Sequence, residues 1–97
     1  MIGHIVLYRM KPGTTADDEI RLVEEARSQL PKLPGVKNLR AGRSIEPGSK
    51  GYAVALVMDF ADEAALEAYR VNPEHQRFVQ KAAGPVVSEI VRFDFRW

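Results

Sequence analysis

Hydrophobic and polar positions follow two different periods along this chain, one typical of strands and the other of helices. Residues 2–10 and 52–60 are rich in β-branched, aliphatic and aromatic side chains, which favours extended structure. Residues 36–45 and 86–96 have the same character, although Gly42 weakens the first of these or marks a bulge. The pattern therefore predicts four strands, of which residues 52–60 form the strongest.

Two segments between these strands repeat their apolar residues at helical spacing. The first begins at Thr15 and Asp18, which have the spacing of a capping box. Its apolar face consists of Ile20, Val23, Ala26 and Leu30. In the second segment, Asp62 caps a helix that runs to about Val71, and Asn72-Pro73 starts a further helical piece. Gly84-Pro85 ends that piece before the last strand.

The predicted order of elements is β-α-β-β-α-β. This order is typical of an α+β, ferredoxin-like domain with a four-stranded antiparallel sheet and two helices on one face. No repeat, low-complexity segment or linker interrupts it, so we expect residues 1–97 to form a single domain.

Both faces of the predicted sheet are apolar. Residues 52–60 place Val54, Leu56 and Met58 on one face, and Ala53, Ala55 and Val57 on the other. An antiparallel sheet with one face in water alternates apolar and polar residues instead, and two helices cover one face only. The sequence therefore predicts that a second copy of the chain covers the other face, giving a homodimer.

Composition excludes several classes of protein. The chain of 97 residues is 45% hydrophobic and 28% charged, as expected for an ordinary soluble domain, and its formal net charge is +1. That balance favours neither nucleic acid nor anionic lipid as a partner. No apolar run approaches the roughly 18 residues that span a membrane, and no basic stretch precedes an apolar block, so we expect a cytoplasmic protein.

Known cofactor and metal motifs give no match. The chain has no cysteine, and its two histidines lack a carboxylate cluster, so no metal site is expected. The Gly48-Ser49-Lys50-Gly51 segment lacks the spacing of a phosphate-binding loop, and no cofactor is expected. Four arginines on the second and fourth strands are interpreted as solvated or as paired at an interface: Arg40, Arg43, Arg92 and Arg96.

The two histidines, His4 and His75, both fall on apolar faces. If Asn72 is the N-cap, His75 shares a helix face with Phe78, and its ring points toward the sheet. One interpretation is a buried structural histidine that hydrogen-bonds a backbone carbonyl or Tyr69. The other is a general base whose pKa is lowered by burial and by the helix N-terminus.

His4 shares its strand face with Val6, Tyr8 and Met10. Since buried polar groups need partners, we expect His4 and His75 to meet at the floor of one polar pocket with Tyr69 and Tyr8. The alternative is that His4 hydrogen-bonds near a loop.

Three parts of the sequence resemble the stress-responsive A/B barrel (Dabb) domain family. They are the opening His4-Ile5-Val6-Leu7-Tyr8-Arg9-Met10-Lys11, the Leu33-Pro34-Gly35-Val36 step into a strand that contains Gly42, and the segment Tyr69 to His75. The last of these is similar to the family motif Tyr-x-x-His-Pro-x-His, with Asn72 in place of the first histidine. The resemblance covers essentially the whole chain.

The resemblance implies a protomer that pairs sheet to sheet into a dimeric α+β barrel. One branch of the family resembles a plant polyketide cyclase that forms olivetolic acid without a cofactor. By this resemblance its important positions correspond to His4, Tyr69 and His75, while a further functional histidine corresponds to Val54. The cyclase reaction is therefore not inherited by the match.

Three hypotheses for function remain open. The first is a domain that binds a small hydrophobic or aromatic molecule between sheet and helices, with Tyr8, Val54, Met58 and Phe78 as contacts. The second is a cofactor-independent cyclase, isomerase or lyase, in which His75 is the base, Tyr69 orients or donates, and His4 assists. The third is a barrel that acts as an oligomerisation module. A cavity beside His75 favours the first two.

Overall fold

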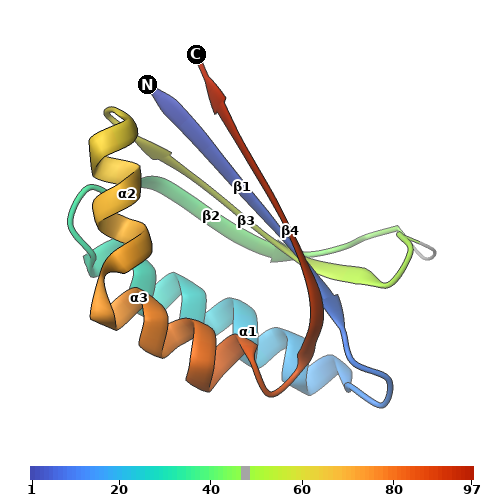
Figure 1. Cartoon of the computed structure of the whole chain (residues 1–97). Coiled ribbons are helices and arrows are strands. Elements are labelled where there is room, and N and C mark those ends of the chain that lie inside the picture. The colour runs from blue at the N-terminus through green and yellow to red at the C-terminus, as the bar shows by residue number, and fades with distance from the viewer. Residues whose placement is uncertain (47–48) are drawn as a thin grey trace.

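The computed structural model describes residues 1–46 and 49–97. Its helices lie on one face of a four-stranded antiparallel sheet (Figure 1), which confirms the predicted ferredoxin-like fold. The elements are β1 (Ile2–Met10), α1 (Ala16–Gln29), β2 (Lys37–Arg43), β3 (Tyr52–Phe60), α2 (Glu63–Val71), α3 (Pro73–Phe78) and β4 (Val87–Arg96). A 3₁₀ turn (Leu30–Lys32) follows α1, and a π-helical segment (Val79–Ala83) extends α3.

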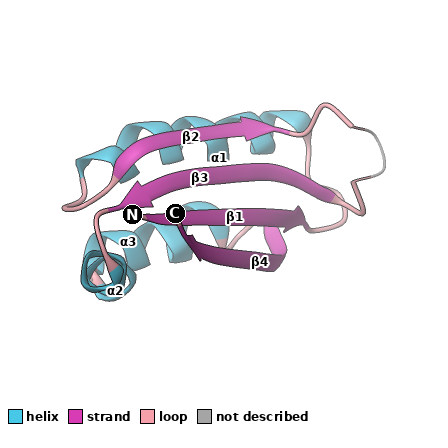
Figure 2. Cartoon of the chain, turned by 90° about the horizontal axis from the view of Figure 1, so that it is seen from above, coloured by secondary structure: helices cyan, strands magenta, loops and turns pink. Residues whose placement is uncertain are grey.

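The strand order in the sheet is β2-β3-β1-β4, so β1 and β3 are central (Figure 2). Residue His4 of β1 is paired with Met58 of β3 on one side and with Asp94 of β4 on the other. Because side chains alternate along a strand, this register fixes which residues of the strands share a face. We call the face under the helices the inner face and the opposite one the outer face.

The core lies between the inner face and the helices. Leu56, Met58 and Phe60 of β3 are at most 1% exposed, and Leu22 and Ala26 of α1 pack in the same cluster. The apolar stripe of α1 is rotated from the predicted one. Ile20 is 39% exposed, whereas Leu22, which the spacing argument omitted, is buried.

The second strand differs most from its prediction. It is shorter at both ends than residues 36–45, and its bulge lies at Asn38 and not at Gly42. Asn38 adopts a φ of 53°, a left-handed conformation that asparagine tolerates well, and its amide donates a hydrogen bond to Asp59 Oδ2 at 3.0 Å. Gly42 pairs regularly with Ala55. The loop predicted after this strand includes Pro47 and Gly48, which lie outside the described residues.

Side-chain caps fix the start of each helix as the sequence predicts. Thr15 and Asp18 form the expected capping box at α1, and Asp62 caps α2 by accepting a hydrogen bond from the Ala65 amide. Asn72 ends α2 and also caps α3, where its side-chain oxygen accepts from the amide of Glu74 at 2.8 Å. The second helical region is therefore broken in two at Asn72.

The outer face is apolar, and the helices shown in Figure 1 all lie on the other side of the sheet. Ile5 of β1 is paired with Val57 of β3 and with Phe93 of β4, and Leu7 is paired with Ala55 and Val91. Phe93 is 61% exposed, and Val91 and Phe95 are 41% and 40% exposed. These side chains form a continuous apolar surface across three strands.

Candidate functional site

A cavity of about 410 Å³ lies between the inner face and the broken helix. β1 contributes its floor, α2 and α3 form one wall, and β4 forms the other. Its lining residues are His4, Val6, Tyr8, Leu56, Tyr69, Arg70, His75, Val79, Ile90 and Arg92.

The break at Asn72 brings Tyr69 and His75 together. These residues are six positions apart, which on an uninterrupted helix places them on different faces. Here α3 starts in a new direction after the cap, and the two ring centroids are 4.1 Å apart with the ring planes tilted by 33°. The two residues therefore meet through their rings.

His75 has one ring nitrogen engaged. Its Nδ1 is 3.3 Å from the carbonyl oxygen of Arg70, and because a carbonyl only accepts, Nδ1 carries the proton in the neutral ring. The other nitrogen, Nε2, then has a free lone pair. Burial lowers the pKa of His75, and the charges of His4 and Arg92 lower it further, against the hydrogen bond to Arg70. The imidazole is therefore neutral at pH 7.

His4 is held by an acidic residue that sequence analysis missed. His4 is 4% exposed, and its Nδ1 contacts Oδ1 of Asp94 on the adjacent strand β4. The other oxygen of Asp94 accepts a hydrogen bond from Arg70 Nη2 at 2.6 Å. Asp94 thus connects a histidine of the sheet to an arginine of α2. The alternation of β4 carries the signal, because residues 90, 92 and 94 share one face.

Two buried tyrosines line the cavity. Tyr8 and Tyr69 are 3% and 2% exposed. Burial raises the pKa of Tyr8 to about 12, and burial together with the nearby Tyr8 raises the pKa of Tyr69 even further. Neither hydroxyl hydrogen-bonds another described residue. The raised pKa values keep both hydroxyls protonated at pH 7, so both can donate a hydrogen bond.

The predicted contacts divide into two groups. His4, Tyr8, Tyr69 and His75 lie together around the cavity. Val54, Met58 and Phe78, which were expected to contact a ligand, are 2%, 0% and 1% exposed, and they do not line it.

Packing explains this correction. Val54, Met58 and Phe78 are covered by other side chains of the core, so they are not open to the cavity, although Val54 and Met58 lie opposite Tyr8 and His4, which line it. Arg92 is exposed, as predicted for a solvated residue, and it also lines the cavity, which was not predicted.

Within residues 1–46 and 49–97, no three His, Asp or Glu side chains are grouped so as to hold a metal ion. None of the helices in these ranges is long and apolar enough to cross a membrane.

Comparison with solved structures places this fold among known ones. A Dabb family protein from Mesorhizobium loti with a ferredoxin-like fold is 29% identical, with a TM-score of 0.84 over 99% of this chain and 95% of that one. A dimeric ferredoxin-like protein from Thermobifida fusca is 24% identical, with a TM-score of 0.85 over 99% and 90% of the two chains.

A hydroxynitrile lyase from Passiflora edulis has the same fold. It is 18% identical, with a TM-score of 0.81 over 97% of this chain and 90% of that one. A search of the curated proteins finds no match. The family model of the stress responsive A/B barrel domain (Dabb) matches residues 2–97. The protein therefore belongs to the stress-responsive A/B barrel domain family.

Proposed function

We propose that the protein binds a small hydrophobic or aromatic molecule in the cavity between sheet and helices. The observation that supports this most directly is the composition of the cavity. Its volume of about 410 Å³ falls in the range of ligand pockets, roughly 300–1,000 Å³. Val6, Leu56 and Ile90 supply an apolar surface, while the polar groups of Tyr69 and His75 converge on the same space.

A titration with a neutral aromatic probe tests this proposal. In a ¹H–¹⁵N spectrum, benzyl alcohol is expected to shift the amides of Tyr69, His75 and Val79 and to leave those of Val91 and Phe93 in place. Val79→Phe places a larger side chain on the cavity wall and is expected to abolish the shifts. Val71→Phe is the matched control, since Val71 is 61% exposed on α2 and does not line the cavity. Shifts spread over the outer face would contradict the proposal.

The outer face supports a homodimer. Its apolar surface includes Phe93, which is 61% exposed, and soluble monomers rarely expose a large contiguous apolar patch. Solved structures that resemble this chain are described as dimeric, among them the protein from Thermobifida fusca. A second copy packed on the same face buries this surface in a two-fold interface. Sedimentation at micromolar concentration is expected to show a dimer, and a stable monomer would contradict the interface.

General-base catalysis without a cofactor is a second candidate, favoured by the state of His75. The Nδ1 hydrogen bond leaves Nε2 as the proton acceptor, and the ring is neutral at pH 7. In a cyclase, isomerase or lyase reaction, Nε2 takes a proton from the ligand, and the Tyr69 hydroxyl donates to the oxygen on which negative charge develops. His4 is held by Asp94 at the floor of the same cavity.

Hydrogen–deuterium exchange tests this candidate without knowledge of the substrate. Phenylacetone has acidic C–H bonds next to its carbonyl, and in D₂O the protein is expected to exchange them faster than buffer does. His75→Ala is expected to lower this rate by about 10²–10⁴. Arg77→Gln, an exposed change on the same helix, is expected to leave it unchanged. A wild-type rate equal to that of buffer would exclude this catalysis while leaving ligand binding in place.

A further inference from the structure

Arg92 occupies an unusual place for an arginine. It lies on β4 opposite Val6, on the inner face of the sheet, between Ile90 and Asp94 in the alternation of that strand. A charged side chain on this face needs either a carboxylate partner or access to solvent. Arg92 lines the cavity and is still exposed, so its guanidinium lies where the cavity meets solvent.

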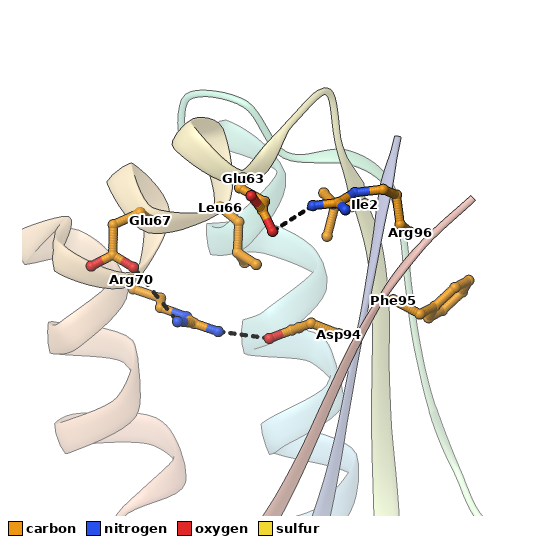
Figure 3. A pocket seen from close by; sticks show the side chains of 8 residues that line it. All are labelled: Ile2, Glu63, Leu66, Glu67, Arg70, Asp94, Phe95 and Arg96. Carbon is orange, nitrogen blue, oxygen red and sulfur yellow. Dashed lines mark hydrogen bonds and ion pairs between the residues drawn. The ribbon is translucent and has the colours of Figure 1, made fainter.

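A neighbouring cavity of about 450 Å³ shows the usual arrangement for comparison (Figure 3). There Arg70 bonds to Asp94 and Arg96 bonds to Glu63, each at 2.6 Å, across the gap between α2 and β4. Every arginine that lines this second cavity is therefore neutralised by a carboxylate of the chain. A ligand entering it gains little from either charge.

The cavity of His75 lacks this neutralisation. None of the described residues that line it is acidic, and Arg92 forms no ion pair or side-chain hydrogen bond in the described part of the chain. Arg70 also lines it, but Arg70 is already paired with Asp94. One positive charge therefore remains without a carboxylate partner, at the solvent-facing rim of the cavity.

The other polar groups around Arg92 also favour a ligand that accepts hydrogen bonds. The hydroxyls of Tyr8 and Tyr69 are donors without an acceptor in the described part of the chain, and both residues line this cavity. The charge of Arg92 contributes to the lowered pKa of His75 and opposes the raised pKa of Tyr8, so it acts on both sides of the cavity. An excess of donors together with an unpaired cation fits a ligand that brings acceptor oxygens and negative charge.

We propose that the ligand of this cavity is a small carboxylate anion, and that Arg92 is the residue that selects it. The planar guanidinium of Arg92 matches a carboxylate with two parallel hydrogen bonds, and the tyrosine hydroxyls donate to the same anion. The apolar body of the ligand packs against Val6, Leu56 and Ile90. This inference rests on the proposed binding function and adds the charge class of the ligand.

Benzoate and benzamide test the inference, because they have nearly the same size and shape and differ in charge. In ¹H–¹⁵N titrations the wild-type protein is expected to bind benzoate at least about tenfold more tightly than benzamide. Arg92→Gln is expected to remove this preference and to retain the affinity for benzamide, which also shows that the variant is folded. Arg77→Gln removes the same charge from α3, outside the cavity, and is expected to keep the preference.

The outcomes separate the inference from the function on which it rests. Equal wild-type affinities for the two probes, or an unchanged preference in Arg92→Gln, would overturn the assignment of an anion while ligand binding stands. Cavity amides that respond to neither benzoate, benzamide nor benzyl alcohol would overturn the binding function, and the charge assignment with it.

Discussion

The inner and outer faces of the sheet are built from the same strands, yet they have opposite characters. On β1, His4, Val6 and Tyr8 point under the helices, whereas Ile5 and Leu7 point away from them. An antiparallel sheet with one wet face usually places its polar residues on the uncovered side. Here the covered face of β1 carries His4 and Tyr8, and the centre of the uncovered face is aliphatic and aromatic.

This difference assigns the two proposed roles, ligand binding and dimerisation, to opposite faces of the sheet. The inner face has the cavity and the polar groups around it, on which the proposed ligand binding depends. The outer face has Phe93 and its neighbours, on which the proposed dimer depends. Because the alternation of a strand assigns adjacent residues to opposite faces, single substitutions test the two roles independently.

The largest effect on the inner face is expected from Met58→Ala. Met58 is 0% exposed in the core, and truncation of a buried methionine lowers the free energy of unfolding by about 2–5 kcal/mol. Denaturant unfolding at constant protein concentration measures this loss. Val57→Ala changes the next residue of β3, which points to the outer face, and is expected to cost less within the protomer. Equal losses for the two variants would remove the distinction between the faces.

The largest effect on the outer face is expected from Phe93→Asp. A charge at the centre of an apolar interface is expected to weaken dimerisation by about 30- to 1,000-fold, the range of an interface hot spot of about 2–4 kcal/mol. Sedimentation over a range of concentrations measures the dissociation constant. Val71→Asp is the matched control, since Val71 is also 61% exposed but lies on α2. A dimer that tolerates Phe93→Asp would place the interface elsewhere.

A smaller effect on the inner face is expected from pH, through His75. Its pKa is lowered from 6.5 by burial, so the unfolded chain takes up a proton at a higher pH than the folded chain does. The contribution of His75 to stability is therefore complete above pH 6.5 and is lost as the pH falls below that value. Thermal unfolding of the wild type and of His75→Gln measures it, because other titrating groups cancel in the difference. A stability advantage of the wild type over His75→Gln that increases as the pH falls would contradict the neutral state of His75.

The fold was predictable because its signals are local. Strand alternation, the Thr15 and Asp18 capping box and the Asn72 cap each depend on residues close in sequence, and the structure confirms them. The bulge of β2 was assigned wrongly, because glycine is the commoner marker of irregular backbone. Asn38 reaches the same conformation with support from Asp59, a residue of the adjacent strand. That support depends on a pairing that sequence alone does not give.

The site was predictable only in part, for the same reason. His4, Tyr69 and His75 stand out because polar residues on apolar faces need an explanation. Asp94 and Arg92 do not stand out, since a mixed strand such as Val87–Arg96 is read as exposed until its register with β1 is known. Conversely, Val54 and Met58 were predicted to contact a ligand, but both are buried in the core, and the packing that covers them depends on contacts between distant parts of the chain.

Because of the break at Asn72-Pro73, one wall of the cavity is formed by a short helix that is not part of the sheet. His75 is carried by α3, a helix of six residues that is joined to α2 through a single cap, while the strands beneath are held by their own ladder of hydrogen bonds. A change in the length or composition of that joint alters the position of the His75 ring relative to His4. The joint lies outside the four strands, so insertions there reshape one wall of the cavity while the residues of the sheet stay the same, which a continuous helix would not accommodate.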